Sequence, residues 1–383
     1  MIEQAKIRYA ELQTQLSDNG ISMAILSDES SIAYFAGFWG YLGIEFGRPT
    51  FLIVRADDKP IVITPLMESE MVEAMTWVKD VRTWEDIGLR SWMAVLSEVI
   101  GKAPRQIWVQ TLLMPAVVRN YFDEYYSQSP LMDISPLIAR QRLIKSPDEI
   151  AIMRKAGEIA ASMMGAAQAS LEEGVPEYES ALAVINAGTR KAAGFLTDKG
   201  WEAFVSPMIH NLQIMQSGRD TSMVHRRASV KKYQRGDPVY FCFCNMAQFK
   251  LYKLGFDRMF FIGEVSDQQA RVQEVANSAQ QAAIDSIRPG IAAEEVAAAA
   301  NEVYLQSGFE TAYRTGRSIG MSYLEAPELK AGDKTILQPG MTFAVDGGIS
   351  VDGECGGRIG DSVYVTETAC EYLTEYDRGL LVV

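Results

Sequence analysis

Three aspartates lie at the ends of strand-like segments: Asp257, Asp346 and Asp361. Aspartate is depleted in β-strands, so its presence in such places needs an explanation. Each can be an ordinary turn or edge residue. Alternatively, the three form a carboxylate cluster in a cleft, where they bind a metal ion or polarise a substrate nitrogen. The spacing alone leaves both explanations open.

An arginine lies among small and apolar residues in the stretch RTGRSIGMSY. Gly316 and Gly320 flank Arg317, and glycine is usual where a backbone bends tightly or approaches a ligand closely. The Arg317 guanidinium is therefore either a surface charge or a planar clamp for an anion. Tyr323, at the end of this stretch, is a candidate substrate-binding residue.

Imidazole is scarce, because His210 and His225 are the only histidines. A multi-histidine metal site is therefore excluded. His225 lies in SGRDTSMVHRR, where a histidine beside two arginines is typical of a surface loop. The alternative is a catalytic role, since histidine titrates near neutral pH. His210 lies in VSPMIHNLQ and is more typical of a core or loop histidine.

The four cysteines are Cys242, Cys244, Cys355 and Cys370, and their spacing fits no zinc site. Cys242 lies in the apolar run VYFCFC, where buried cysteine usually behaves as a small hydrophobic residue. A nucleophilic cysteine needs a nearby cation that lowers its pKa. The neighbouring sequence shows no such cation, but it leaves a nucleophilic Cys242 open.

The elements that position these residues fall into two parts. Residues 1–135 contain a helical N-terminus and short apolar strands, which predicts an α/β domain. In LIKSPDEIAIMRKA, Ser146 is a suitable N-cap before Pro147, which predicts a helix at the start of a second domain, 136–383. Further helices are expected at 176–194, 266–287 and 292–307, and the strand-like runs between and after them indicate an α+β fold.

The formal net charge is -13, from 36 basic and 49 acidic residues. This charge argues against binding to nucleic acid or to an anionic membrane surface. We find no signal peptide and no apolar run of membrane-spanning length, and we expect a cytoplasmic protein.

Several segments together resemble the creatinase/prolidase/aminopeptidase P family, whose C-terminal domain has the pita-bread fold. The resemblance is carried, in order along the chain, by RGDPVYF, GFDRMFF, TGRSIG, LQPGMTFAVDGGI and GGRIGDSVYVTETACEYLT. LIKSPDEIAIMRKA is similar to the family's domain junction. The resemblance implies a pita-bread catalytic domain at 136–383 and a smaller α/β domain at 1–135.

Most members of this family are metallopeptidases with two aspartates, a histidine and two glutamates as ligands. The resemblance places these ligands at Cys242, Gly255, Arg317, Asp346 and Asp361. Three of the five positions lack the oxygen or imidazole donors of a hard dinuclear centre. The resemblance therefore implies that the metal centre is lost and that no cofactor is bound.

Two metal-independent members, creatinase and ectoine hydrolase, are similar in further segments. EFGRP places Phe46 and Arg48 at residues that contact the substrate carboxylate from the neighbouring subunit, which implies a homodimer. SGRDTSMVH places His225 at the catalytic histidine of creatinase. Asp257 and Asp346 fall on two creatinase glutamates, which implies that they hold a cationic nitrogen group of the substrate.

The expected activity is therefore hydrolysis of a C–N bond in a small zwitterionic amidine or guanidine. His225 would deprotonate water and return the proton to the leaving nitrogen. Asp257 and Asp346 would bind the substrate without titrating themselves, while Arg48 would position its carboxylate. Arg317 would pair with the aspartates or hold a carboxylate.

Two alternatives stay open, a metal-dependent Xaa-Pro peptidase and a non-catalytic pita-bread binding protein. The sequence also leaves open the identity of the substrate and the choice between hydrolysis and elimination.

Overall fold

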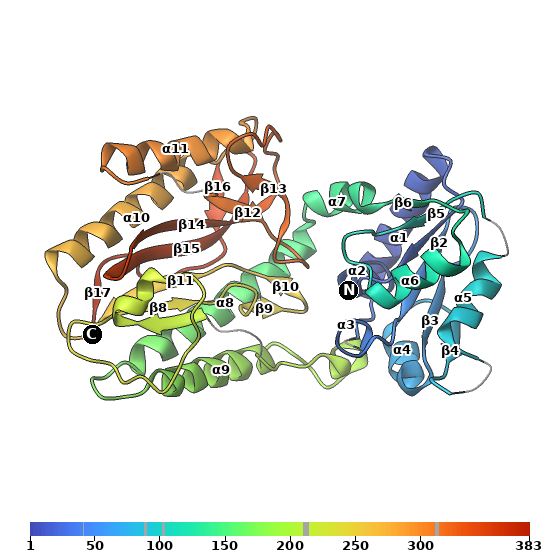
Figure 1. Ribbon diagram of the computed structural model, residues 1–383, viewed down its shortest axis with the longest axis horizontal. Helices are drawn as coiled ribbons and strands as arrows, with labels where there is room; N and C mark the ends of the chain where they lie inside the picture. Colours follow the sequence, from blue (N-terminus) through green and yellow to red (C-terminus); the bar gives the residue numbers. More distant parts are fainter. Residues whose placement is uncertain (41, 88–89, 102–103, 210–213, 311–313) are drawn as a thin grey trace. The chain divides into compact units, whose positions relative to one another are not determined.

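The computed structural model describes residues 1–40, 42–87, 90–101, 104–209, 214–310 and 314–383 (Figure 1). The chain forms two compact units. The first comprises Met1–Arg142 together with Asp198–Phe204, and the second comprises Leu143–Thr197 together with Val205–Val383. A short segment from the second half of the chain thus belongs to the first unit.

The first unit is built on a six-stranded mixed sheet with the order β4-β3-β2-β1-β5-β6. Its strands are β1 (Met23–Leu26), β2 (Phe51–Arg55), β3 (Ile61–Pro65), β4 (Asp80–Trp84), β5 (Ile107–Val109) and β6 (Leu131–Asp133). Its helices are α1 (Ile2–Asp18), α2 (Glu29–Ala36), α3 (Leu42–Phe46), α4 (Ser69–Met75), α5 (Trp92–Ile100) and α6 (Ala116–Tyr125), and α7 (Ser135–Leu143) crosses the boundary between the units. The strands β2 and β3 follow one another in the chain and pair antiparallel.

The second unit contains a nine-stranded sheet. Its main path has the order β13-β12-β14-β15-β11-β8-β7, while β16 pairs with β15 and β17 pairs with β11. The strands are β7 (Ile214–Ser217), β8 (Pro238–Cys242), β11 (Asp257–Phe261), β12 (Gly316–Ser318), β13 (Glu325–Leu329), β14 (Thr342–Val351), β15 (Cys355–Val365), β16 (Cys370–Tyr372) and β17 (Leu381–Val382). The short strands β9 (Gln248–Phe249) and β10 (Tyr252–Lys253) form a separate pair.

Four long helices accompany this sheet: α8 (Pro147–Ala169), α9 (Glu177–Ala193), α10 (Asp267–Ser286) and α11 (Ala293–Gln306). The predicted start of α8 is confirmed, because the Ser146 hydroxyl accepts a hydrogen bond from the Glu149 amide. The Glu149 carboxylate accepts one from the Ser146 amide in return, which completes a capping box. No helix of the described residues is long and apolar enough to cross a membrane.

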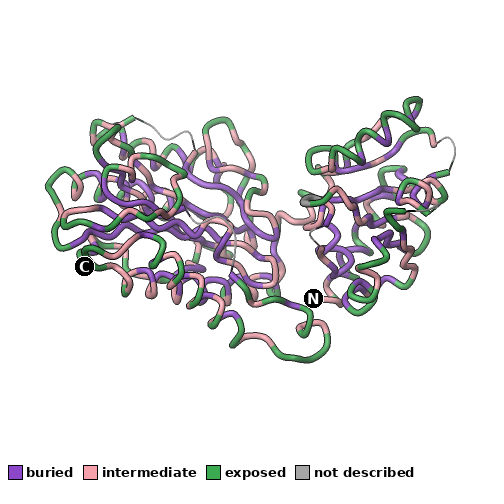
Figure 2. Tube along the Cα trace, turned by 60° about the horizontal axis from the view of Figure 1, so that its bottom comes forward, coloured by how far each residue is buried: buried purple, intermediate pink, exposed green. Residues whose placement is uncertain are grey.

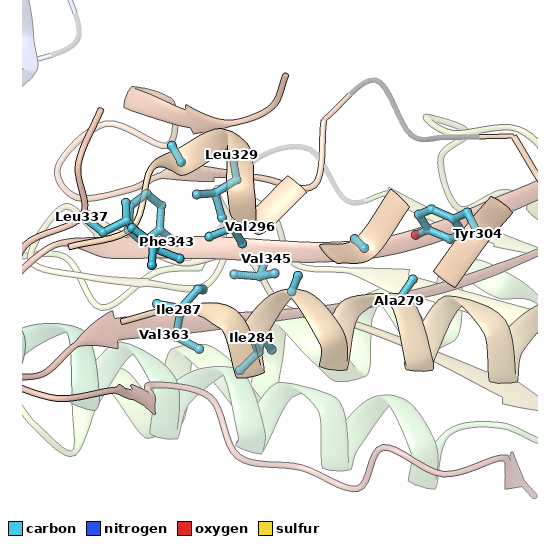
Figure 3. Close-up of a cluster of buried hydrophobic side chains, with 14 of the residues drawn as sticks. Ala279, Ile284, Ile287, Val296, Tyr304, Leu329, Leu337, Phe343, Val345 and Val363 are labelled. Atoms are coloured by element: carbon cyan, nitrogen blue, oxygen red, sulfur yellow. The ribbon is translucent and has the colours of Figure 1, made fainter. Parts of the chain in front are cut away.

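A buried hydrophobic cluster of the second unit lies between α10, α11 and one face of the sheet (Figure 3). Ile284 and Val296 of the helices pack with Val345 and Val363 of the central strands. Figure 2 shows that these strands are largely buried. Because side chains alternate along a strand, the residues next to these valines point to the opposite face of the sheet. The alternation therefore decides which polar residues can meet there.

Candidate active site

Strand register brings two of the three aspartates together. Gly360 of β15 lies directly opposite both Asp257 of β11 and Asp346 of β14. A Cβ atom added at Gly360 would lie 2.8 Å from Asp257 Oδ2 and 3.1 Å from Asp346 Oδ1. The two carboxylates therefore converge over the residue that lacks a side chain, as the cluster hypothesis requires.

Arg317 is part of the same cluster and is not a surface charge. Its side chain is only 5% exposed and forms an ion pair with Asp346. Its Nη2 atom donates to Cys244 Sγ at 3.5 Å, and its guanidinium lies 4.2 Å from the centre of the Tyr323 ring. Gly316 is required next to it, because a Cβ there would lie 2.5 Å from the Ala344 carbonyl oxygen.

Asp257 occupies an environment that favours its neutral form. It is buried, accepts a hydrogen bond of 2.9 Å from the Tyr240 hydroxyl, and lies 3.5 Å from Cys244 Sγ. Burial, and then the negative charge of Asp346, raise the pKa of Asp257 to about 6. The expectation that Asp257 does not titrate is therefore wrong, because burial was not visible in the sequence.

The thiol of Cys242 is poorly suited to nucleophilic attack. Burial, contact with Cys244 and the charge of Asp257 raise its pKa well above the ordinary value. The thiolate is the nucleophilic form of cysteine, and this environment disfavours it. The structure therefore supports a packing role for Cys242 and argues against its predicted place among the catalytic residues.

Asp361 does not face this cluster. It is paired in register with Val345 and therefore lies on the helix-covered face of the sheet. Its buried carboxylate accepts hydrogen bonds from Arg258 and Thr374, each at 2.9 Å, and from Gln280 and Arg378, each at 3.2 Å. Its predicted role in substrate binding is corrected by this placement, since its oxygens are already bound by the protein.

The residues of the cluster do not fit a dinuclear metal centre. The donor atoms of Cys242, Cys244 and Asp257 lie within 4.8 Å of one another, which is a possible grouping for a single soft ion. The Arg317 guanidinium, however, lies beside Cys244 and pairs with Asp346. A second cation in this position would be repelled by the guanidinium.

Three buried polar atoms of the cluster have no hydrogen-bond partner among the described residues: Asp346 Oδ1, Tyr323 Oη and Arg317 Nε. Two of them border the space left by glycines. A Cβ at Gly255 would lie 3.3 Å from Tyr323 Oη, and one at Gly360 would lie 3.1 Å from Asp346 Oδ1. Buried polar atoms are normally satisfied, so this arrangement is suited to a small polar ligand.

The remaining predicted residues lie elsewhere. His225 is exposed in the segment after η3 (Gly218–Ser222), and no hydrogen bond or ion pair among the described residues links it to the two carboxylates. Phe46 and Arg48 belong to the first unit, where Arg48 pairs with Asp86 at 2.9 Å. The roles of these three residues stay predictions. His210 lies outside the described residues.

Sequence reasoning missed two residues of the cluster, Tyr240 and Gly360. Tyr240 lies two residues before Cys242 in the same strand, so strand alternation places both on one face. Gly360 has no functional side chain, so the family's metal-ligand position was assigned to the neighbouring carboxylate, Asp361. Strand pairing is the observation that distinguishes the two.

Comparison with known proteins identifies the fold and the family. Residues 151–367 match the metallopeptidase family M24, and residues 8–144 match the creatinase/prolidase N-terminal domain. The chain is 29% identical over 384 residues to the agropine synthesis cyclase of Rhizobium rhizogenes, covering 96% of this chain and 94% of that protein. It is 25% identical over 398 residues to the ectoine hydrolase of Halomonas elongata, covering 98% and 96%.

A solved prolidase from Thermococcus sibiricus superimposes with a TM-score of 0.87 at 26% identity, over 99% of both chains. The predicted α+β class, with a pita-bread domain after a smaller α/β domain, is thereby confirmed. The chain belongs to the metallopeptidase M24 family and carries the creatinase/prolidase N-terminal domain.

Proposed function

We propose that this protein is a metal-independent hydrolase of a C–N bond in a small zwitterionic amidine or guanidine. One observation carries the proposal: the buried Arg317 guanidinium, ion-paired with Asp346, occupies the cluster that the resemblance aligns with a metal centre. A fixed organic cation there supplies positive charge without a metal ion. The ectoine hydrolase among the relatives supports a non-peptide substrate.

The residues of the cluster suit recognition of a cationic nitrogen group. Asp346 Oδ1 is buried without a partner among the described residues, and the Asp257 carboxylate lies across Gly360 from it. Both can accept hydrogen bonds from the N–H groups of an amidinium or guanidinium. Arg317 holds the Asp346 carboxylate in place through their ion pair.

In the proposed reaction, His225 takes a proton from water as the oxygen attacks the carbon of the C–N bond. The C–N bond then breaks, and the leaving nitrogen takes a proton from His225. Asp257, with its pKa of about 6, is a second group able to supply a proton to the nitrogen near neutral pH. Each step moves one proton and requires no redox partner.

The carboxylate of the substrate would be held by Phe46 and Arg48 of a neighbouring subunit in a homodimer. Arg48 already binds one carboxylate through two of its nitrogens, since Nε and Nη2 contact Asp86 at 3.0 and 2.9 Å. A substrate carboxylate would replace Asp86 in this geometry. Mixing Arg48→Ala with His225→Ala should restore part of the activity, whereas a monomer at micromolar concentration would contradict shared sites.

A second candidate is ring closure with loss of water. The relative that is 29% identical over 96% of this chain is named a cyclase. In such a reaction a group of the substrate takes the place of water as the nucleophile, and the same carboxylates and His225 can serve as acid and base. A linear substrate that yields a ring, without consumption of water, would favour this candidate.

The two alternatives noted from the sequence are less well supported. A metal-dependent Xaa-Pro peptidase needs ligands that Gly255, Arg317 and Gly360 cannot provide. A non-catalytic binding protein has no need for two converging carboxylates, one of them buried and with its pKa raised to about 6.

The test is a turnover screen with ectoine, creatine and Xaa-Pro dipeptides, each with and without a chelator. The proposal predicts turnover of an amidine or guanidine compound that resists the chelator and falls about 10²–10⁴-fold in His225→Ala. Turnover of the dipeptides alone, with loss on chelation, would assign the peptidase function instead. Binding without turnover of any compound would favour the non-catalytic alternative.

A further inference from the structure

A buried carboxylate outside the cluster holds the segment that carries His225. Glu177, the first residue of α9, has no exposed surface. Its Oε1 atom accepts a hydrogen bond of 2.7 Å from the Ser217 hydroxyl. Its Oε2 atom accepts three more, from Arg226 Nη1 at 2.9 Å and from the amide and hydroxyl of Ser229 at 2.9 and 2.8 Å.

These donors lie on both sides of His225 in the sequence. Ser217 ends β7 before the segment, while Arg226 and Ser229 follow His225. One side chain of α9 thus binds the two ends of the stretch that contains the histidine. Each bond to an ionised carboxylate is of the stronger, charge-assisted kind.

The backbone of the segment is tied to β7 as well. The Met215 amide donates to the Arg226 carbonyl at 3.1 Å, and the Gln216 side chain donates to the Met223 carbonyl at 2.6 Å. Arg226 also pairs with Asp220 at 3.0 Å. The residues immediately around His225 are therefore fixed, although the imidazole itself is exposed.

The environment of Glu177 keeps it ionised. Burial raises the pKa of this carboxyl, but the hydrogen bonds from Ser217, Arg226 and Ser229 outweigh burial, and the pKa is lowered. A buried carboxylate is costly unless all of its oxygens are bound. The Glu177 carboxylate accepts four hydrogen bonds, more than the start of a helix requires. This excess indicates that Glu177 also orders the segment around His225.

We infer that Glu177 is a positioning residue that orders residues 223–229 and so fixes His225 for proton transfer. This inference rests on the proposed function, in which His225 is the general base. Glu177→Gln is the matched perturbation, because it keeps the shape of the side chain. It replaces one acceptor oxygen with an NH₂ group and removes the charge that binds Arg226.

Glu149→Gln is the control, since Glu149 is likewise a buried glutamate in the first turn of a long helix of the same unit. It accepts hydrogen bonds from the Ser146 amide and the Tyr252 hydroxyl, away from the His225 segment. Both substitutions neutralise a buried carboxylate, so loss of stability alone should affect the two variants similarly.

The experiment combines amide hydrogen exchange with kinetics on the substrate found in the screen. Glu177→Gln should speed exchange of residues 223–229 by about tenfold or more, whereas Glu149→Gln should leave these residues unchanged. In Glu177→Gln, kcat should fall at least about tenfold while KM changes less than about threefold. The double variant Glu177→Gln/His225→Ala should be no slower than His225→Ala alone.

Unchanged exchange of 223–229 in Glu177→Gln would overturn the inference, as would an equal fall in kcat in Glu149→Gln. Failure of the proposed function has a different signature, because His225→Ala would then keep wild-type turnover.

Discussion

Gly360 is the residue at which the geometry of the site can be tested by adding a single methyl group. In Gly360→Ala, the new Cβ atom would lie 2.8 Å from Asp257 Oδ2, 2.9 Å from Asp257 Cγ and 3.1 Å from Asp346 Oδ1. Contacts below 3.0 Å cannot persist, so at least one carboxylate must move. Neither moves freely, because Tyr240 holds Asp257 and Arg317 holds Asp346.

The size of the effect follows from these contacts. Forcing one extra methyl group into a packed site costs about 1–3 kcal/mol of stability. For a unit of this size, the melting temperature falls by about 2–4 °C per kcal/mol, so we expect a loss of about 2–12 °C. Displacement of a reacting group by about 1 Å costs on the order of 10²-fold in turnover, so kcat should fall by a similar factor.

The assay compares thermal unfolding and kcat of Gly360→Ala with those of a glycine control. Gly165 lies within α8, and a Cβ added there meets no other heavy atom within 4 Å. Gly165→Ala should therefore raise stability by about 0.5–1 kcal/mol, because alanine is the better helix former. Wild-type melting temperature and turnover in Gly360→Ala would refute the convergence of the two carboxylates over Gly360.

Three further predictions concern the same cluster. The pKa of Asp257 is raised from 3.8 to about 6 on folding, so the free energy of unfolding of the wild type should fall relative to that of Asp257→Asn as pH rises from about 4 to about 6, and the difference should stay constant above that. Chemical denaturation of both proteins across pH 4–8 measures this difference, and a constant difference over the whole range would contradict the prediction. Cys242→Ala and Cys242→Ser should keep near-normal turnover, since the Cys242 thiol is held protonated; a drop beyond about tenfold would restore its role as nucleophile. Tyr323→Phe removes a buried hydroxyl that has no partner among the described residues, so KM should rise about tenfold while the melting temperature stays the same. An unchanged KM would exclude contact between this hydroxyl and the substrate.

Much of the fold was predictable because local patterns specify it. The helices expected at 176–194, 266–287 and 292–307 are α9, α10 and α11, whose bounds differ by one residue at each end. The start of α8 follows from Ser146 and its capping box. Apolar runs marked the central strands of the second unit, since a strand buried on both faces reads as continuous hydrophobic sequence.

The membership of the site was only partly predictable, because it depends on register. Asp346 and Asp257 were identified from their places in strand-like segments. The choice between Gly360 and Asp361 rests on one residue of register, and a shift by one moves a side chain to the other face of a sheet. The sequence favoured Asp361 because it carries a carboxylate, whereas the pairing of β14 with β15 places Gly360 on the face of the cluster.

The electrostatics of the site could not be obtained from the sequence at all. The raised pKa of Asp257 depends on burial between neighbouring strands and on the nearby charge of Asp346. The ion pair of Arg317 with Asp346 joins residues 29 positions apart, through the pairing of β12 with β14. Such long-range contacts have no local sequence signal.

The central claim is that Arg317 replaces a metal centre in the chemistry of this site. The most direct test is the turnover of the substrate found in the screen, measured before and after chelation, together with elemental analysis of the purified protein. The account predicts unchanged turnover after chelation and far less than one transition-metal ion per chain. About two metal ions per chain, with turnover lost on chelation and restored by Mn²⁺ or Co²⁺, would contradict it.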